Sequence, residues 1–429
     1  MAPCRSGGGP TLIRIESIAA GGDGIGRLDD GRAVFVPRTA PGDLVELGQV
    51  RTQARFARGR IARLVEPGPG RVEPACPHYT ADACGSCQLQ HLSAPAQLEA
   101  KRQIVEDTLR RIGRLEVVVP PVIAAQNAWG YRSRISLAVG PGRRFAGYHT
   151  LGDAGRVFGL THCAIAAPEL MQLWPALRRH LQLLPTDATH IMLRLDRGGA
   201  RHVVVKAAGH QAWSNGPRLG AALATAGVPA TIWWHPEAGA ARVVDHSGEL
   251  FPATVFEQVH PALGDTIRTA AIAALGPLTG AQVWDLYAGI GETSALLLEA
   301  GARVESVELD RRAVEFAERR VAAAVPANAG DSPSMVRRVG RVEDLVQSLG
   351  RPNAVIANPP RAGLSPPVLA ALLAHRPTRI AYISCDPATL ARDLGRLCAG
   401  ASAFRLRTVQ PYDLFPQTAH VEILAVLEA

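Results

Sequence analysis

Hydrophobic and polar positions divide the chain into stretches with different periodicities. From about Thr11 to Glu66, short apolar runs alternate with glycine turns such as Gly21-Gly22-Asp23-Gly24, a pattern typical of a small all-β barrel. From about Phe256 onward, apolar runs that fit buried strands alternate with segments of helical spacing. This alternation predicts a parallel sheet covered by helices on both faces.

The stretch between these two regions is less regular. Pro67-Gly68-Pro69-Gly70 predicts a linker, and residues 95–114 have helical spacing, with one apolar side made of Leu98, Ile104, Val105, Leu109 and Ile112. We therefore predict a multidomain α/β protein. It has an OB-like β-barrel over 1–67, a central α+β domain over 68–254, and a Rossmann-like domain over 255–429. The strands predicted in the last domain are 283–287, 304–309, 354–357 and 379–384, and its helices are 293–300, 311–324, 367–374 and 388–398.

Composition and charge narrow the class of partner. The 429 residues contain no apolar run near the ~20 residues of a membrane span, and the first ten residues lack the apolar segment of a secretory signal. We expect a cytoplasmic protein without a membrane partner, and no obligate protein partner is evident. The formal net charge of +8 favours a polyanion. Five arginines lie between residues 51 and 63 of the barrel, with no acidic residue among them: Arg51, Arg55, Arg58, Arg60 and Arg63. This cluster favours contacts to RNA or DNA phosphates over a charged strand that only faces water.

A glycine turn follows the first predicted strand of the C-terminal domain. Asp285-Leu-Tyr-Ala-Gly289-Ile-Gly291 lets the backbone approach a ligand at the start of a helix. Seventeen residues after Gly291 comes Glu308, an acid placed to accept hydrogen bonds from ribose hydroxyls. The third glycine of the dinucleotide fingerprint and a phosphate-binding lysine are both missing. The pattern therefore favours a nucleoside cofactor such as S-adenosylmethionine over NAD.

Two later segments carry candidate chemistry. Asn358, in Asn-Pro-Pro-Arg, follows a predicted strand, and its amide complements the N3–H and O4 of a uracil edge. Cys385 follows the next strand and precedes a helix, a position that favours the thiolate. A thiolate that adds to carbon 6 of uracil makes carbon 5 nucleophilic, and a base must then remove the carbon-5 proton. Glu422 is the candidate base, and His420 ranks below it.

Four further cysteines form a candidate metal site. Cys76-x7-Cys84-x2-Cys87 is followed by the distant Cys163, and the polar, Gly-Ser-rich surroundings suggest an exposed cluster. Without a secretory signal, metal binding is a better interpretation than disulfides. Four thiolates suit a [4Fe–4S] cluster or a zinc ion, and spacing alone does not separate them. Cys4 and Cys398 are given no role.

Taken together, these residues resemble the RNA uracil-5-methyltransferase family over nearly the whole chain. Ser-Cys-Asp-Pro-Ala-Thr-Leu-Ala-Arg-Asp (384–393) and Phe-Pro-x-Thr-x-His-x-Glu (415–422) carry most of the resemblance. It implies a class I methyltransferase domain that uses S-adenosylmethionine, a TRAM-type RNA-binding barrel, Cys385 as nucleophile and Glu422 as base. Many members carry Asp-Pro-Pro-Arg where this chain has Asn358, but asparagine can still pair with a uracil edge. The implied cofactor and active-site positions are Gln258, Asp285, Tyr287, Gly289, Gly291, Glu292, Glu308 and Asn358.

The resemblance also bears on the metal and the RNA. Related ribosomal-RNA enzymes carry a [4Fe–4S] cluster on matching cysteines, so we favour iron–sulfur over zinc. Barrel and cysteines together favour 23S ribosomal RNA, with transfer RNA as the alternative. A catalytically silent RNA-binding or assembly factor is a second alternative. Methylation of an amino nitrogen, suggested by Asn-Pro-Pro, is a third.

Overall fold

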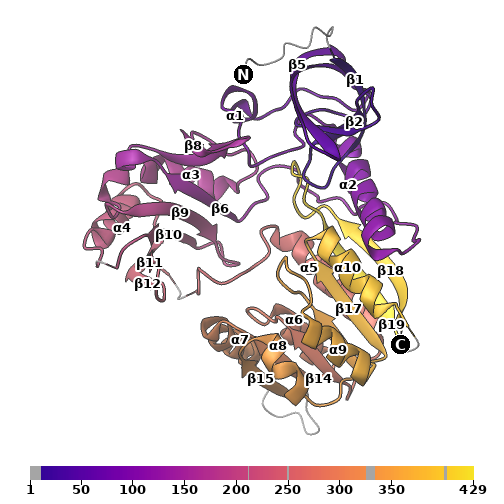
Figure 1. Ribbon diagram of the computed structural model, residues 1–429. Coiled ribbons are helices and arrows are strands. Elements are labelled where there is room, and N and C mark those ends of the chain that lie inside the picture. Colours follow the sequence, from indigo (N-terminus) through magenta and orange to yellow (C-terminus); the bar gives the residue numbers. More distant parts are fainter. Residues whose placement is uncertain (1–10, 211, 249–250, 325–333, 401–402) are drawn as a thin grey trace.

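The computed structural model folds into three lobes, each built on its own sheet (Figure 1). It describes residues 11–210, 212–248, 251–324, 334–400 and 403–429, so Cys4 and the N-terminal segment judged not to be a signal lie outside it. Within these residues, no helix combines the length and the apolar character needed to cross a membrane. The multidomain α/β fold is as predicted.

The N-terminal lobe is a closed five-stranded barrel in the order β1-β2-β3-β5-β4. Alternate residues of β1 point inward, and Ile13 and Ile15 pack with Val34, Val45 and Ala57 in a small core. This burial of every second residue is what the short apolar runs predict. The strands are β1 (Thr11–Ile18), β2 (Gly24–Arg27), β3 (Ala33–Val36), β4 (Leu44–Thr52) and β5 (Phe56–Glu66).

A short helix, α1 (Pro77–Ala81), and a long one, α2 (Ala94–Thr108), lead away from the barrel. A π-helical turn, Leu109–Gly113, ends α2, where a helix to residue 114 is predicted. The predicted apolar side of this helix is partly wrong. Ile112 is 50% exposed, whereas Gln97 and Lys101 are buried. Buried polar side chains need partners, and both find them in a C-terminal loop described below.

The central lobe is a seven-stranded sheet in the order β12-β11-β10-β9-β6-β7-β8. Helices α3 (Pro168–Arg178) and α4 (Gly216–Thr225) pack on it around Leu173, Trp174 and Leu219. The strands are β6 (Arg134–Val139), β7 (Ala146–Thr150), β8 (Asp153–Gly159), β9 (Ala188–Leu195), β10 (Arg201–Ala207), β11 (Thr231–Pro236) and β12 (Arg242–Asp245). Local pattern predicted little of this lobe, because few of its segments keep one clear period.

The C-terminal lobe is a doubly wound sheet in the order β15-β14-β13-β16-β17-β19-β18, parallel except for β19. One apolar cluster includes side chains of α5 and α6, and another includes side chains of α9 and α10. The strands are β13 (Gln282–Leu286), β14 (Arg303–Glu308), β15 (Met335–Val339), β16 (Ala354–Ala357), β17 (Arg379–Ser384), β18 (Arg405–Tyr412) and β19 (Glu422–Glu428). The helices are α5 (Pro261–Leu275), α6 (Glu292–Glu299), α7 (Arg311–Ala324), α8 (Val342–Leu345), α9 (Pro366–His375) and α10 (Pro387–Leu397).

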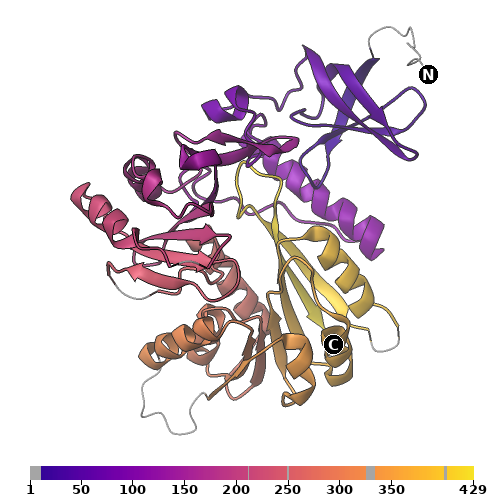
Figure 2. The same ribbon diagram turned by 60° about the vertical axis from the view of Figure 1, so that its left-hand side comes forward.

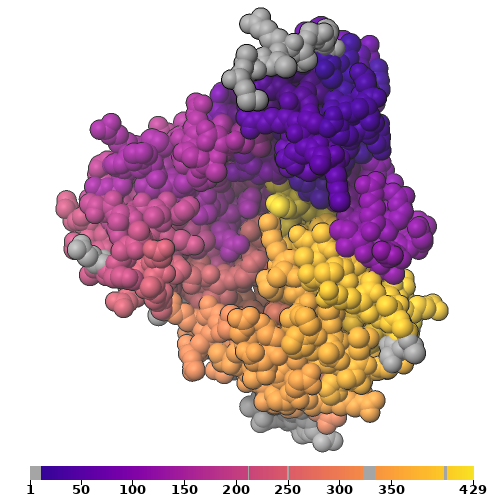
Figure 3. Space-filling view, viewed as in Figure 1, coloured from indigo at the N-terminus to yellow at the C-terminus, as the bar shows by residue number. Residues whose placement is uncertain are grey.

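The lobes meet where a loop of the C-terminal lobe reaches the base of the barrel (Figures 1 and 2). This loop, residues 413–421 between β18 and β19, is drawn in yellow and lies beside α2, below the barrel in Figure 1. One apolar cluster joins these parts: Ile18, Ala40, Leu89, Leu92, Ala100, Ile104 and Ala419. A recess lies where the lobes converge in the space-filling view (Figure 3).

Candidate active site

The glycine turn after β13 lies at the topological switch point of the C-terminal sheet, where β14 and β16 leave on opposite sides. Ligands bind at this crevice in doubly wound folds. Tyr287, Gly289 and Gly291 have φ of 63°, 55° and 74°, so the chain turns sharply before α6 begins. A side chain at Gly289 would meet no atom within 4 Å, so there is open space above the turn that a cofactor can occupy.

Acidic residues surround this turn. Glu308, at the end of β14, accepts a 2.9 Å hydrogen bond from the backbone N–H of Gly289. Asp285 is buried and accepts a 2.5 Å hydrogen bond from the Ser294 hydroxyl. Burial, and then the nearby Glu308, raise the pKa of Asp285 to about 7. The two acids therefore help to fix the loop that a nucleoside would contact.

Glu292 occupies the first position of α6 but is engaged elsewhere. Its carboxylate forms ion pairs with Arg197 of the central lobe at 2.5 Å, Arg268 of α5 at 3.0 Å and Arg320 of α7 at 3.4 Å. Glu292 thus links the two lobes beside the cofactor turn, while its predicted cofactor contact stays a prediction. Asn358 follows β16 and donates its backbone N–H to the Leu286 carbonyl oxygen at 3.3 Å, which keeps it next to the same turn.

Cys385 and Glu422 lie side by side because β17 and β19 are antiparallel neighbours. Ser384 pairs with Ile423 in the register of these strands, so the residue after β17 is next to the first residue of β19. Cys385 is half-buried, and the N-cap of the following helix is Asp386, which accepts from the N–H of Thr389 at 2.9 Å.

The protonation states differ from what the sequence predicts. Burial, and then the Glu422 carboxylate, raise the pKa of the Cys385 thiol, and the guanidinium of Arg361 lowers it only in part. The expectation that this position favours the thiolate is therefore wrong for the free protein. Burial also raises the pKa of Glu422, to about 8.

Gln258 approaches the same pair. Its amide donates to Glu422 Oε1 at 3.5 Å. The other carboxylate oxygen, Oε2, is buried without a hydrogen-bond partner among the described residues. Gln258 therefore lies beside the candidate base, which is where an active-site glutamine of the kind implied by the family resemblance is expected.

Arg361 received no role from the sequence, yet it lies at the centre of this group. Its guanidinium affects the pKa of both Cys385 and Glu422, and its Nη2 lies 3.4 Å from His420 Nε2. Desolvation of the ring, and then the charge of Arg361, lower the pKa of His420 to about 4, although the residue as a whole is solvent-exposed. The signal that could have found Arg361 is its position directly after Asn-Pro-Pro, at a strand end.

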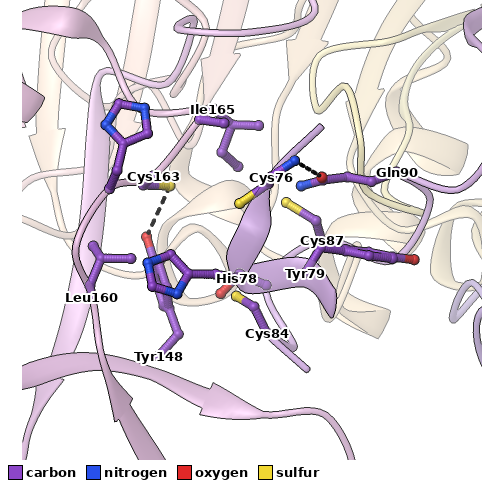
Figure 4. Close-up of a pocket in the computed structure, with 13 residues that line it drawn as sticks. Cys76, His78, Tyr79, Cys84, Cys87, Gln90, Tyr148, Leu160, Cys163 and Ile165 are labelled. Atoms are coloured by element: carbon purple, nitrogen blue, oxygen red, sulfur yellow. Dashed lines mark hydrogen bonds between the residues drawn. The ribbon is translucent and has the colours of Figure 1, made fainter. Parts of the chain in front are cut away.

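The four cysteines of the candidate metal site line one cavity, which lies between α1, the segment after it, and the segment after β8. Figure 4 shows Cys163 reaching in from one side, with Cys76, Cys84 and Cys87 on the other. Tyr148 Oη lies 3.9 Å from the Cys163 sulfur. All four side chains are buried, so the expectation of an exposed cluster is wrong. Polar sequence neighbours of the cysteines, Ser86 and Gln90, line the same cavity.

Burial raises the pKa of the thiols of Cys84 and Cys163, and that of Cys87 to about 12. Among the residues that the structure describes, no three or more Cys, His, Asp or Glu side chains are gathered closely enough to hold one metal ion. The structure thus brings the four predicted ligands to one cavity without forming a single-ion site.

On the barrel, the five arginines of strands β4 and β5 and their connection are all exposed. Arg58 and Arg63 pair with Asp23 and Glu46, at 3.5 and 3.0 Å. The remaining three, Arg51, Arg55 and Arg60, form no ion pair within the described part of the chain.

The doubly wound fold, its glycine turn and the acid that ends β14 define an S-adenosylmethionine-dependent methyltransferase of class I. The family described as tRNA (Uracil-5-)-methyltransferase matches residues 251–429, and the TRAM domain matches 11–62. An RNA methyltransferase of Thermosynechococcus vestitus is 32% identical, over 97% of each chain. A 23S rRNA (uracil(1939)-C(5))-methyltransferase of Azoarcus sp. is 30% identical, over 98% of this chain and 99% of the relative.

The fold has a match among solved structures. The Pyrococcus abyssi tRNA (uracil-54, C5)-methyltransferase, in complex with S-adenosyl-L-homocysteine, has a TM-score of 0.69 at 22% identity and covers 97% of this chain and 100% of its own. The chain belongs to the RNA uracil-5-methyltransferase family, and its barrel is a TRAM domain.

Proposed function

We propose that the protein methylates carbon 5 of a uridine in 23S ribosomal RNA, with Cys385 as nucleophile and Glu422 as base. The choice of RNA is supported by the 30% identical relative that acts on 23S rRNA and by the presence of both a TRAM barrel and the cysteine site. Transfer RNA is the alternative, since the matching family description and the Pyrococcus structure concern tRNA enzymes.

The register of β17 and β19 is the observation that carries the mechanism, because it makes a thiol and a buried carboxyl group neighbours. S-adenosylmethionine, when bound, supplies an electrophilic methyl group on a sulfonium. Gly289, Glu308 and Asn358 line the crevice that would hold it. The target uridine must leave its stack to reach this point.

Each chemical step of the reaction can then be assigned to a residue of this chain. The Cys385 thiol loses its proton to solvent and its sulfur bonds to carbon 6, which moves an electron pair to carbon 5. Carbon 5 would then take the methyl group, and the cofactor would be left as a neutral thioether. Glu422 Oε2, which has no hydrogen-bond partner among the described residues, takes the proton from carbon 5. The electrons of that C–H bond restore the double bond and expel the Cys385 thiolate. Arg361, beside both groups, favours their ionised forms.

We further propose a [4Fe–4S] cluster on Cys76, Cys84, Cys87 and Cys163. Four thiols around one cavity are a donor set for soft metals. Four thiolates on one zinc ion, at about 2.3 Å each, would crowd to within ~3.8 Å of one another. A cluster gives each thiolate its own iron and suits wider spacing. Iron, sulfide and zinc content of the protein purified without oxygen would distinguish the two metals.

The catalytic assignment is tested with RNA that carries 5-fluorouridine at the target. Fluorine at carbon 5 blocks proton removal, so the wild type should form a denaturation-resistant adduct with RNA, and Cys385→Ala should form none. Cys398→Ala, at the other end of α10, is the matched control and should behave as wild type. A wild type that binds RNA and forms no adduct would favour the silent binding factor or amino-nitrogen methylation.

The RNA assignment needs a separate measurement. A strain that lacks the protein should lose 5-methyluridine at one position of 23S rRNA and keep it in transfer RNA. Loss from transfer RNA alone would overturn the ribosomal assignment and leave the chemistry intact.

A further inference from the structure

The loop that precedes the candidate base is held by residues outside its own lobe. Gln97 of α2 donates to Gln417 Oε1 at 2.9 Å and accepts from the Gln417 backbone N–H at 3.0 Å. The backbone N–H of Leu89, two residues after Cys87, donates to Gln417 O at 3.0 Å. Both glutamine side chains are about 95% buried, so these hydrogen bonds are shielded from water.

A second contact from α2 holds the start of the loop. Lys101 is fully buried, and its ammonium forms an ion pair with Asp413 and donates to Phe415 O at 3.0 Å. The same carbonyl accepts from the Thr418 hydroxyl at 2.9 Å. The Thr418 hydroxyl oxygen in turn accepts from the His420 N–H at 3.3 Å. A chain of hydrogen bonds thus runs from α2 to within two residues of Glu422.

The backbone of Gln417 shows that these contacts impose a conformation. Its φ of 70° lies in the left-handed region, which costs a non-glycine residue roughly 1–2 kcal/mol. Such a conformation persists only where surrounding contacts enforce it, and it is frequent next to active sites. Three hydrogen bonds from outside the lobe enforce it here, five residues before Glu422.

We propose that Gln97 and Lys101 are positioning residues for Glu422, acting through the loop 413–421. The proposal rests on the proposed function, in which Glu422 removes the carbon-5 proton. Neither side chain touches the reacting atoms. Together they fix where β19 begins, and so the distance between the Glu422 carboxylate and Cys385. The base is therefore aligned by a helix that belongs to a different part of the chain.

The test separates proton removal from the earlier steps. On RNA with ordinary uridine, displacement of the base should leave methylated RNA attached to Cys385, because the adduct forms but cannot be resolved. We expect Gln97→Ala to lower kcat about tenfold, to accumulate this adduct, and to leave the KM for S-adenosylmethionine unchanged. Gln97→Glu keeps the acceptor for the Gln417 N–H and should fall between Gln97→Ala and wild type.

Controls make the outcomes distinct. Gln103→Ala removes a glutamine of the same helix whose side chain, among the described residues, hydrogen-bonds only to Glu99, at 2.8 Å; this variant should behave as wild type. Lys101→Met combined with Asp413→Leu removes the buried pair together, and it should trap adduct in the same way if the protein remains folded. A Gln97→Ala protein that loses kcat without accumulating adduct would overturn the proposal. If Glu422→Gln itself traps no adduct, it is the base assignment that fails.

Discussion

Replacing Glu422 with glutamine tests whether the candidate base is a buried, protonated acid in the free protein. Glutamine keeps the size of the side chain and removes the ionisation. The folded pKa of Glu422 is about 8, against 4.5 for an exposed glutamate. An acid whose pKa is raised by folding contributes stability below pH 4.5, and this contribution is lost as pH rises to 8. The wild type should therefore lose stability over this range, and the variant should not.

The size of the effect follows from the pKa difference. At about 1.36 kcal/mol per unit, the variant should be more stable than wild type by roughly 3 kcal/mol at pH 7, and by less than about 1 kcal/mol at pH 5. For a domain of this size, that is a Tm increase of roughly 6 to 12 °C at pH 7. Calorimetry of the whole protein at pH 5, 6, 7 and 8 measures it.

The matched control is Glu428→Gln at the other end of β19, where the carboxylate is partly exposed and pairs with Arg407 at 2.9 Å. Its removal should change stability by less than about 1 kcal/mol. A Tm difference for Glu422→Gln that is absent, or equal at every pH, would refute the reasoning that burial keeps this carboxyl group protonated.

Four other measurements follow from the structure. In the proposed mechanism Glu422 and Cys385 both act without their protons, so the single-turnover rate should rise about a hundredfold per pH unit well below pH 8; a flat profile would contradict this. Gly291→Ala places a Cβ 2.6 Å from that of Ala317, and this clash should weaken S-adenosylhomocysteine binding at least tenfold. Gly280→Ala, a control with a similar φ of 70° and open space around the new Cβ, should not weaken it. Arg51→Ala should reduce the salt slope of RNA binding by about 0.7–0.9, if that arginine contacts one phosphate, and an unchanged slope would remove it from the interface. Cys87→Ser should lose iron while it still binds S-adenosylhomocysteine, and retained iron would exclude this residue as a ligand.

Local pattern predicted the elements of the C-terminal sheet well. The four predicted strands match β13, β14, β16 and β17 to within a residue at each end. A parallel strand that is buried on both faces is a continuous apolar run, so its limits can be seen in the local sequence alone. The glycine turn and Glu308 followed from their positions at strand ends. The order of strands, however, is a property of the whole domain.

The neighbourhood of Cys385 and Glu422 shows this limit. Nothing local to residues 415–428 indicates that β19 inserts antiparallel beside β17. The sequence named Glu422 as the candidate base because the chemistry needs one, and the family resemblance supported that choice, but neither showed how the fold brings it next to Cys385. The raised pKa of the thiol escaped prediction for the same reason, since it depends on burial and then on Glu422, which is distant in sequence.

Gln97 and Lys101 were missed because a polar residue on a helix is expected to face water. Their spacing of four residues put them on one face of α2, but only the loop packed against that face shows why the face is buried. A polar pair of this kind has no signature until its partners are known.

The contact between the barrel and the loop 413–421 limits how the protein can change its target. Gly22, in the first turn of the barrel, has φ of 90°, and a Cβ there would lie 2.6 Å from that of Gln88 and 3.1 Å from that of Ala419. A barrel exchanged for one with different RNA preference must therefore reproduce this turn, or the incoming barrel will press on the loop 413–421 that leads to Glu422. Evolution of specificity in such a chain should proceed by changes on the outer arginine-bearing strands and leave the inner turn alone.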